Sequence, residues 1–369
     1  IWQNIIKMIL FLMKCYIWDF MGEIALDRKD RKLLYYLSEN GRLSYSVLAA
    51  NVGLSREAVK NRIEKLVKGR VILSFRAQST HPYFGLEFYN LYLSFARMDA
   101  KRQKEYENYI KKHPAVMWDN KCLGKWDYVL LLLVKDLADF SEIISDFKEK
   151  FQGNIKEYEF DVVLYEYVYK ARVNAFFKGL EAGPPKIQRE DSSFYRLLAN
   201  TTIIVEKKRE KHELDLADVK ILELLSDNCR QTLEEMSAKA GLPVENIRYR
   251  MKRLISWHAI VAFWAAINYD LFGLHWYRIR LRLQKVPAEK EKGLKEFLTN
   301  HDKVFWSARS VGRADLHIDI RAEDNNALNV FLQEFNSNFG EITIDYEALV
   351  MTNDHDYNNF APKMYEIAK

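Results

Sequence analysis

The chain has little cysteine and no cysteine motif. Its 369 residues include three cysteines, Cys15, Cys122 and Cys229, which lie far apart, and no C-x-x-C pair occurs. Neither a disulfide framework nor a zinc site is therefore indicated. A reducing cytoplasm is the simplest setting for such a sequence, and we predict a cytoplasmic location.

Common catalytic and phosphate-binding motifs are also absent. The sequence has no G-x-S-x-G, P-loop or G-x-G-x-x-G pattern, and its eight histidines show no H-x-x-x-H or H-E-x-x-H spacing. We therefore expect no enzyme activity, no cofactor and no metal. Neither sign of charge is in large excess, since the chain has 56 Lys and Arg residues and 51 Asp and Glu residues, for a net charge of +5. Only the distribution of charge can then indicate a polyanionic partner.

One long apolar run is present, at residues 1–20. Lys7, Lys14 and Asp19 interrupt it, and a Lys at the centre of a membrane helix costs about 2.5–3.5 kcal/mol. No small-residue cleavage site follows it. We interpret residues 1–20 as upstream sequence before a natural start at Met21, with a membrane anchor or an extra helix as the alternatives, and we expect no membrane partner.

A repeat organises the rest of the chain. "GLSREAVKNRIEKL" begins at Gly53, and "GLPVENIRYRMKRL" begins 188 positions later, at Gly241. The same offset aligns "LDRKDRKLLYYLSENGR" with "LDLADVKILELLSDNCR", and "GKWD" with "GRAD". One offset held over about 140 residues indicates a duplication of a whole unit.

Each copy begins with a helical half. Asp27 and Ser44 are good N-caps for the first two helices, and Gly53 separates the second from a third, which Ser55 caps. A short apolar strand follows. Three short helices with a Gly turn before the third predict a winged helix-turn-helix, in which the third helix enters the DNA major groove.

The second half of each copy alternates strands and helices in the order β-α-β-β-α-β, the ferredoxin-like arrangement. The predicted fold class is thus α+β, with two repeats, each a winged helix-turn-helix followed by a ferredoxin-like domain. The predicted segments are an extension (1–20), a first head (21–78), a first β-α-β-β-α-β domain (79–170), a linker (171–210), a second head (211–266), a second β-α-β-β-α-β domain (267–353) and a tail (354–369).

The third helix of each head carries basic and polar residues away from its apolar stripe. Such a face on a lone helix is usually only solvated surface, but here it has the right neighbours and occurs twice, which favours double-stranded DNA as the partner. In the second copy Pro243 and Val244 replace Ser55 and Arg56, which removes a cap. The predicted DNA contacts are Ser55, Arg56, Lys60, Asn61, Arg62 and Lys65 in the first copy and Arg248, Tyr249, Arg250, Lys252 and Arg253 in the second.

These motifs together resemble the Lrp/AsnC (feast/famine) family of prokaryotic transcription regulators, from Met21 to about Met351 apart from the linker. The resemblance implies paired β-α-β-β-α-β domains, two DNA-binding heads per dimer, and an amino acid or similar effector bound near the G-x-x-D turn. Because this chain holds both units, we predict a single-chain pseudo-dimer, with pairing of two chains as the alternative.

By this resemblance the candidate effector sites are the two turns, Gly124 to Asp127 and Gly312 to Asp315. The alternative is that each Asp only stabilises its turn. The strand after the second turn places His317, Asp319 and Arg321 on the face of Asp315, where the first copy has Val129, Leu131 and Leu133. This polar stripe predicts either a polar ligand pocket or, as the alternative, a more hydrated sheet face or an ion-paired interface.

Two other functions fit the same architecture. Siroheme decarboxylases resemble the family in both halves and would use histidine and arginine around a tetrapyrrole. A nucleoid-organising protein would bind DNA with strong salt dependence and little sequence choice. A bound coloured tetrapyrrole would indicate the decarboxylase, a shift of specific duplex DNA would indicate a regulator, and DNA binding that follows salt but not sequence would indicate the nucleoid-organising protein.

Overall fold

The computed structural model of the chain describes residues 25–79, 85–96, 98–170, 172–186, 212–352 and 360–368. The predictions for residues 1–20 and for most of the linker lie outside these ranges. Within them, no helix has the length and apolar character needed to cross a membrane.

The first head consists of α2 (Arg28–Glu39), α3 (Tyr45–Val52) and α4 (Arg56–Lys68). The predicted caps are confirmed, since the side chain of Asp27 accepts from Asp30 N and that of Ser44 accepts from Val47 N. Gly53 ends α3 in the left-handed region, at φ 69°, which glycine adopts without strain. The caps and the left-handed Gly53 therefore set where α2 and α3 begin and where the chain turns toward α4.

The second head repeats this arrangement with α8 (Leu216–Asp227), α9 (Leu233–Ala240) and α10 (Val244–Ser256). Thr232 and Glu235 form a capping box at the start of α9. Pro243 stands at the N-cap of α10 and makes no side-chain hydrogen bond. The two heads therefore share a fold but differ at the start of the third helix.

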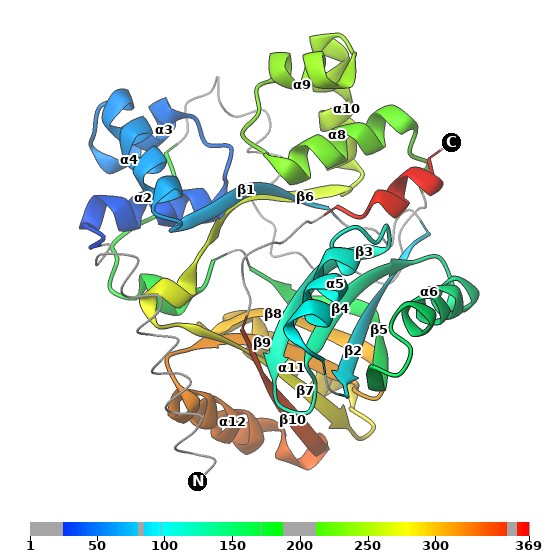
Figure 1. Cartoon of the computed structure of the whole chain (residues 1–369). Coiled ribbons are helices and arrows are strands. Elements are labelled where there is room, and N and C mark those ends of the chain that lie inside the picture. The colour runs from blue at the N-terminus through cyan, green and yellow to red at the C-terminus, as the bar shows by residue number, and fades with distance from the viewer. Residues whose placement is uncertain are drawn as a thin grey trace.

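A two-stranded ribbon joins the heads. Strand β1 (Ile72–Ser79) follows the first head and β6 (Ile260–Ile267) follows the second, and they pair antiparallel with each other. The strand that follows each head thus pairs with its equivalent in the other copy. Figure 1 shows both heads above this ribbon, with the remaining strands below it.

Each head also rests on the strand of the other copy. Gly41 N in the first head donates to Phe263 O of β6 at 2.9 Å, and Cys229 N in the second donates to Phe75 O of β1 at 2.8 Å. Arg230 of the second head reaches Gly41 O of the first at 2.6 Å. The heads and the ribbon therefore form one connected layer.

Both copies then form the β-α-β-β-α-β order that was predicted. The elements of the first are β2 (Glu87–Phe95), α5 (Ala100–Ile110), β3 (Val116–Leu123), β4 (Tyr128–Val134), α6 (Leu137–Lys150) and β5 (Ile155–Tyr169). Those of the second are β7 (His275–Leu283), α11 (Ala288–Asn300), β8 (Val304–Gly312), β9 (Leu316–Ala322), α12 (Asn325–Phe339) and β10 (Thr343–Met351). Short 3-10 turns, η2 (Asn174–Phe177) and η4 (Tyr269–Phe272), pack against the first head.

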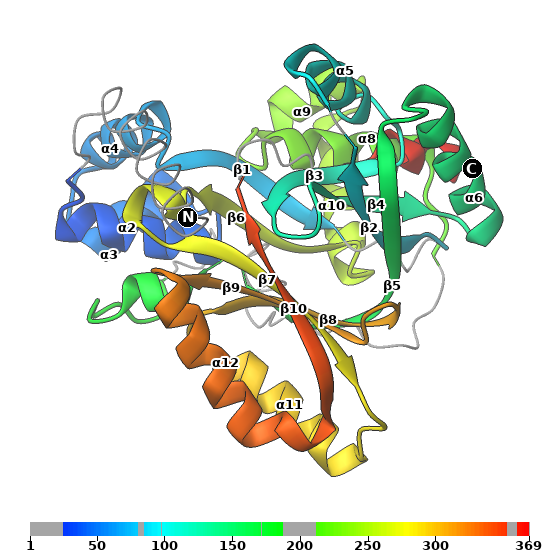
Figure 2. The ribbon, with the colours of Figure 1, turned by 60° about the horizontal axis from the view of Figure 1, so that its bottom comes forward.

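The two sheets close into one barrel, in the strand order β10-β3-β4-β2-β5-β8-β9-β7. Strand β5 of the first copy pairs with β8 of the second over most of its length, and β10 pairs briefly with β3. Figure 2 shows α11 and α12 outside the second sheet, away from α5 and α6. The inner faces of both sheets are therefore enclosed together.

The C-terminal segment contains the short turn η6 (Pro362–Glu366). Lys363 Nζ lies 2.5 Å from Asp139 of α6, and Tyr365 donates to Glu223 of α8 at 2.7 Å. The end of the chain thus joins the first β-α-β-β-α-β domain to the second head.

Candidate DNA-binding heads and sensor cavity

Helix α4 exposes most of the side chains predicted to contact DNA. Ser55 caps it by accepting from Ala58 N at 3.1 Å, and Val59, Ile63 and Leu66 are buried in the head. The opposite face leaves four predicted contacts exposed, namely Arg56, Lys60, Asn61 and Lys65. Free N–H groups, a hydroxyl and three cations at one helix face are the groups that bind phosphates and base edges.

Helix α10 exposes fewer such groups. Tyr249 and Lys252 are exposed, and the Arg248 side chain is 43% exposed while it pairs with Glu245 at 3.1 Å. The missing N-cap at Pro243 also leaves the start of this helix with one fewer polar side chain. The second head therefore presents a smaller basic surface than the first.

Three predicted contacts turn inward. Arg62 Nη1 lies 2.7 Å from carboxylate oxygens of Asp27 and Asp30 at the start of α2. Arg250 makes the equivalent contacts with Asp215 and Asp218 at the start of α8. Arg253 also pairs with Asp218, at 2.6 Å. The expectation that Arg62, Arg250 and Arg253 face outward is therefore wrong: their charges compensate the acidic caps of the first helix in each head.

The two G-x-x-D turns have matching geometry. Gly124 and Gly312 have φ of 138° and 147°, where a side chain is strained. Asp127 Oδ2 accepts from Phe95 N at 2.7 Å, and Asp315 Oδ2 accepts from Leu283 N at 2.8 Å. Each carboxylate thus ties its turn to the neighbouring strand, the structural role given above as the alternative. An effector role for these turns remains a prediction.

The polar stripe of β9 is buried inside the barrel. His317, Asp319 and Arg321 are at most 4% exposed. His317 Nε2 lies 3.3 Å from Asp161 of β5, and its Nδ1 lies 3.2 Å from the hydroxyl of Tyr92. Both partners belong to the first copy. The stripe therefore forms part of a buried polar interface between the copies.

Burial and charge act in opposite directions on these groups. Burial favours the neutral form of the Asp161 carboxyl, but His317, Arg280 and the Ala314 N–H outweigh it and lower the pKa of Asp161 to about 2. Burial lowers the pKa of His317 from its usual 6.5, and the nearby Asp161 only partly offsets this. An ionised Asp161 beside a neutral His317 is the resulting state near pH 7.

Arg278 and Asp319 form a second buried pair. Arg278 Nε and Nη2 each lie 2.7 Å from an oxygen of Asp319, and Nη1 donates to Asn90 Oδ1 at 3.3 Å. The guanidinium centre is 5.0 Å from the ring centroids of both Trp118 and Trp306. Bidentate bonding and stacking suit Arg at such a site.

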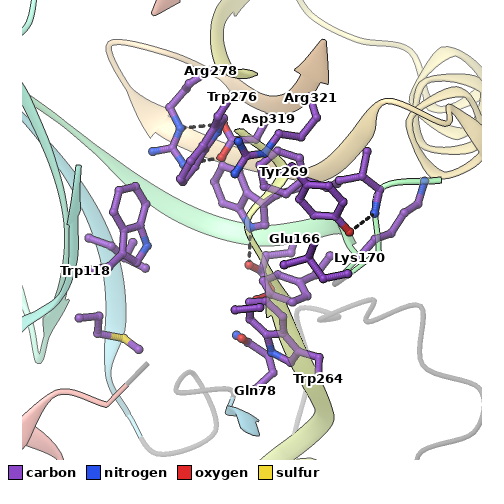
Figure 3. Close-up of a pocket in the computed structure, with 18 of the residues that line it drawn as sticks. Gln78, Trp118, Glu166, Lys170, Trp264, Tyr269, Trp276, Arg278, Asp319 and Arg321 are labelled. Atoms are coloured by element: carbon purple, nitrogen blue, oxygen red, sulfur yellow. Dashed lines mark hydrogen bonds and ion pairs between the residues drawn. The ribbon is translucent and has the colours of Figure 1, made fainter. Parts of the chain in front are cut away.

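A cavity of about 120 Å³ lies between the barrel interior and the ribbon (Figure 3). Asp319 and Arg321 line it, whereas His317 and the residues of both turns do not. Its other walls come from β1 to β8 and η4 and are rich in aromatic side chains: Phe88, Trp118, Tyr169, Trp264, Tyr269, Trp276, Phe305 and Trp306. The predicted polar stripe and a real cavity thus meet at only two residues.

The sequence pattern missed three charged groups of this cavity, Arg278, Glu166 and Lys170. Burial raises the pKa of Glu166 to about 7, although Trp306 Nε1 donates to its carboxylate at 2.6 Å. Burial also lowers the pKa of Lys170 to about 8. Nothing in the alternation of β5 marks Glu166, because polar residues occur along both faces of that strand. Elsewhere in the described ranges, no three His, Cys, Asp or Glu side chains are grouped to hold a metal ion.

Comparison with known proteins identifies the heads. The model of the AsnC-type helix-turn-helix domain matches residues 26–67 and again 214–255. The chain is 31% identical over 124 residues to the proline dehydrogenase transcriptional activator of Rhizobium radiobacter, covering 33% of this chain and 78% of that protein. It is 30% identical over 122 residues to the Bkd operon transcriptional regulator of Pseudomonas aeruginosa, covering 33% and 80%.

Among solved structures, the siroheme decarboxylase NirDL has the same tandem architecture. It superposes with a TM-score of 0.52 at 12% sequence identity, over 92% of this chain and 96% of that one. At this identity the likeness concerns the fold alone. Family membership follows instead from the matched heads and from relatives that are matched over most of their length. The chain belongs to the Lrp/AsnC family of DNA-binding transcriptional regulators.

Proposed function

We propose that one chain performs the task of a family dimer, as a single-chain pseudo-dimer that binds DNA with two unequal heads. The observation that carries this proposal is that the two copies pair strand to strand: β1 pairs with its equivalent β6 in the ribbon, and in the closed barrel β5 of the first copy pairs with β8 of the second while β10 of the second pairs with β3 of the first. A homodimer presents the same surface twice and suits a symmetric site. Two heads in one chain can diverge and so suit an asymmetric one.

The proposed DNA surface of the first head consists of Ser55, Arg56, Lys60, Asn61 and Lys65, which are all exposed. The first four lie in the N-terminal half of α4, the part of a recognition helix that meets base edges. Lys65 is placed for a backbone phosphate. This head supplies most of the sequence selectivity in our proposal.

The proposed surface of the second head consists of Arg248, Tyr249 and Lys252 on α10. Arg250 and Arg253 are left out because the acidic caps of α8 hold them. Fewer free cations and no Ser55 equivalent predict weaker and less selective binding by this head.

The β-α-β-β-α-β domains serve as the sensor in this proposal, and a small metabolite such as an amino acid is the effector expected from the family. A tetrapyrrole fits the cavity poorly. An engineered cavity of about 150 Å³ holds a single benzene ring, and the volume here is about 120 Å³. The decarboxylase alternative therefore rests on the fold alone.

Light scattering tests the pseudo-dimer. The proposal predicts that a particle with the mass of one chain binds one DNA duplex that contains the region upstream of the gene for this protein. If only a two-chain particle bound that duplex, the pseudo-dimer would be contradicted. An absorbance spectrum of the purified protein tests the alternative, since a bound tetrapyrrole absorbs strongly in the visible range.

A further inference from the structure

Arg42, in the turn between α2 and α3 of the first head, reaches into the second head. Its Nη1 donates to Cys229 O and, at 3.2 Å, to Gln231 O in the turn between α8 and α9. Its guanidinium centre lies 5.4 Å from the ring centroid of Phe263 on β6. A planar guanidinium has several donors in fixed directions, so it can bridge two carbonyl oxygens while it lies over a ring. One side chain thus joins the first head to the second head and to the ribbon.

Arg230 makes the reciprocal contacts. It lies in the turn between α8 and α9, and its Nη1 donates to Gly41 O at 2.6 Å and to Leu43 O at 3.0 Å. Its guanidinium centre lies 5.2 Å from the ring centroid of Phe75 on β1. The offset of 188 residues relates each donor, acceptor and ring of this contact to its counterpart in the first. The same contact is therefore made twice between the heads, once in each direction.

Together these contacts fix rotation as well as distance. A single hydrogen-bonded side chain would allow a head to turn about it, whereas two reciprocal contacts do not, because turning about either one breaks the other. The backbone bonds from Gly41 N to Phe263 O and from Cys229 N to Phe75 O hold the same two turns on the ribbon. All four carbonyl acceptors of the arginines belong to buried residues, and leaving a buried polar group unpaired costs free energy. The two heads are thus held in one relative orientation.

Each head has a further anchor in the segment that follows the last strand of its own copy. Arg31 of α2 donates to Phe176 O of η2 at 2.7 Å, and Tyr365 of η6 donates to Glu223 of α8 at 2.7 Å. The turns η2 and η6 begin 188 residues apart and are therefore equivalent. Neither head is attached to the rest of the molecule through its ribbon strand alone.

From these observations we propose that Arg42 and Arg230 are positioning residues that fix the separation and orientation of α4 relative to α10, so that the chain binds two half-sites at one spacing only. Neither arginine belongs to the proposed DNA surfaces, and both act through the heads that they join. The consequence for DNA rests on the proposed function, whereas the fixed geometry of the heads does not. Half a helical turn of added DNA, about five base pairs, moves one half-site to the opposite side of the duplex. Heads that turned independently would tolerate this change, and heads joined in this way would not.

The first test measures the geometry of the heads without DNA. Double electron-electron resonance gives the distance distribution between nitroxide labels at Glu57→Cys and Glu245→Cys in the full chain. These two positions are exposed, lie in the first turns of α4 and α10, and are related by the offset of 188. Cys122 and Cys229 are buried, and Cys15→Ser removes the remaining native thiol.

The variants separate the two arginines from charge and from folding. Arg42→Ala/Arg230→Ala removes the contact, and Arg42→Lys/Arg230→Lys keeps both charges but not the planar fork. Lys148→Ala/Lys150→Ala is the matched control, at exposed positions on α6. Thermal unfolding checks that each variant is folded, and the lysine pair replaces the alanine pair if the latter does not fold. We expect one narrow distribution for the wild type and the control, and a broader one for both arginine pairs. A broad wild-type distribution, or arginine pairs as narrow as the wild type, would overturn the assignment.

The second test measures the spacing of the DNA site. Footprinting on the region upstream of the gene locates the two half-sites, and affinities are then compared for that duplex and for one with about five base pairs inserted between them. For the wild type we expect the insertion to weaken binding roughly tenfold or more. In Arg42→Ala/Arg230→Ala this ratio should fall toward one, a change that loss of stability alone would not produce because it weakens binding to both duplexes equally.

The outcomes distinguish this inference from the proposed function. Equal wild-type affinity for both duplexes, or a full spacing penalty in the folded alanine pair, would contradict the positioning role. A narrow distance distribution in a chain that binds no DNA contradicts only the proposed function. A broad distribution in a chain that does bind DNA contradicts only this inference.

Discussion

At the scale of single residues, buried histidines make stability depend on pH. Burial lowers the pKa of His113, His301 and His317. Below pH 6.5 the unfolded chain therefore binds protons that the folded chain does not, so stability falls as the pH falls. Asp161 acts in the same direction at lower pH, because its stabilisation is present above 3.8 and is lost as the pH falls through about 2.

We predict that the melting temperature of the wild-type chain falls between pH 7.5 and pH 5.5, and that His317→Gln reduces this difference. Glutamine can hydrogen-bond with the Tyr92 hydroxyl but takes up no proton in this range. Scanning calorimetry at both pH values measures the change, with His212→Gln as the control for the substitution itself. An undiminished pH difference in His317→Gln would show that His317 does not contribute.

The sequence predicted which residues cap the helices, but it did not predict which way the basic side chains of the recognition helices point. Asp27 and Ser44 could be recognised as caps because capping depends on neighbours three positions away. The inward turn of Arg62 and Arg250 could not, because both orientations are compatible with a basic residue beside an apolar stripe. The cavity could not be predicted either, since Asn90, Glu166 and Trp264 come together from three strands that are far apart in sequence.

At the scale of elements, the two recognition helices differ most at their first residue. Ser55 accepts from Ala58 N, whereas Pro243 makes no side-chain cap. We predict that Ser55→Ala lowers the free energy of unfolding by about 1 kcal/mol. Pro243→Ser should raise it by less, because removing a proline also increases the entropy of the unfolded chain. Urea titration measures both, and equal effects of the same sign would contradict this explanation.

The pairing of β1 with β6 in the ribbon is the feature at this scale that the sequence did not predict. A strand after each head was predicted, but its partner was not, because an apolar run of this length contains no information on which edge it meets. The tight contact at Gly41 shows how closely the layer is packed, since a Cβ there would lie 2.8 Å from the backbone carbon of Trp264.

We therefore predict that Gly41→Ala destabilises the chain by about 1–3 kcal/mol, because ribbon backbone cannot move aside as a flexible side chain can. Gly293→Ala is the matched control. No atom outside its own helix lies within 4 Å of that position in α11, and alanine is favoured over glycine in a helix by about 1 kcal/mol. Thermal unfolding should shift in opposite directions for the two variants, and a stabilised Gly41→Ala would refute the contact.

At the scale of the whole molecule, the repeat predicted what each half contains and the structure adds how the halves join. One offset of 188 residues implied two heads and two β-α-β-β-α-β domains. The closed barrel follows from two sheets that each have a free edge strand to pair. Equivalent positions then meet inside it, as Asn90 does with Arg278 and Tyr92 with Arg280. Divergence between the copies has placed a charge opposite a neutral partner in both cases.

The most direct test of DNA binding by the two heads is an electrophoretic mobility-shift assay at low and moderate salt. It compares a DNA duplex from the region upstream of the gene with random DNA. Arg56→Ala/Lys60→Ala removes the first head's cations, and Arg248→Ala/Lys252→Ala removes those of the second. Lys148→Ala/Lys150→Ala removes the same charge from exposed positions on α6. We predict a specific shift that weakens roughly tenfold or more with the first pair, less with the second, and little with the third. No shift at low salt, or equal losses with all three pairs, would contradict DNA binding by these helices.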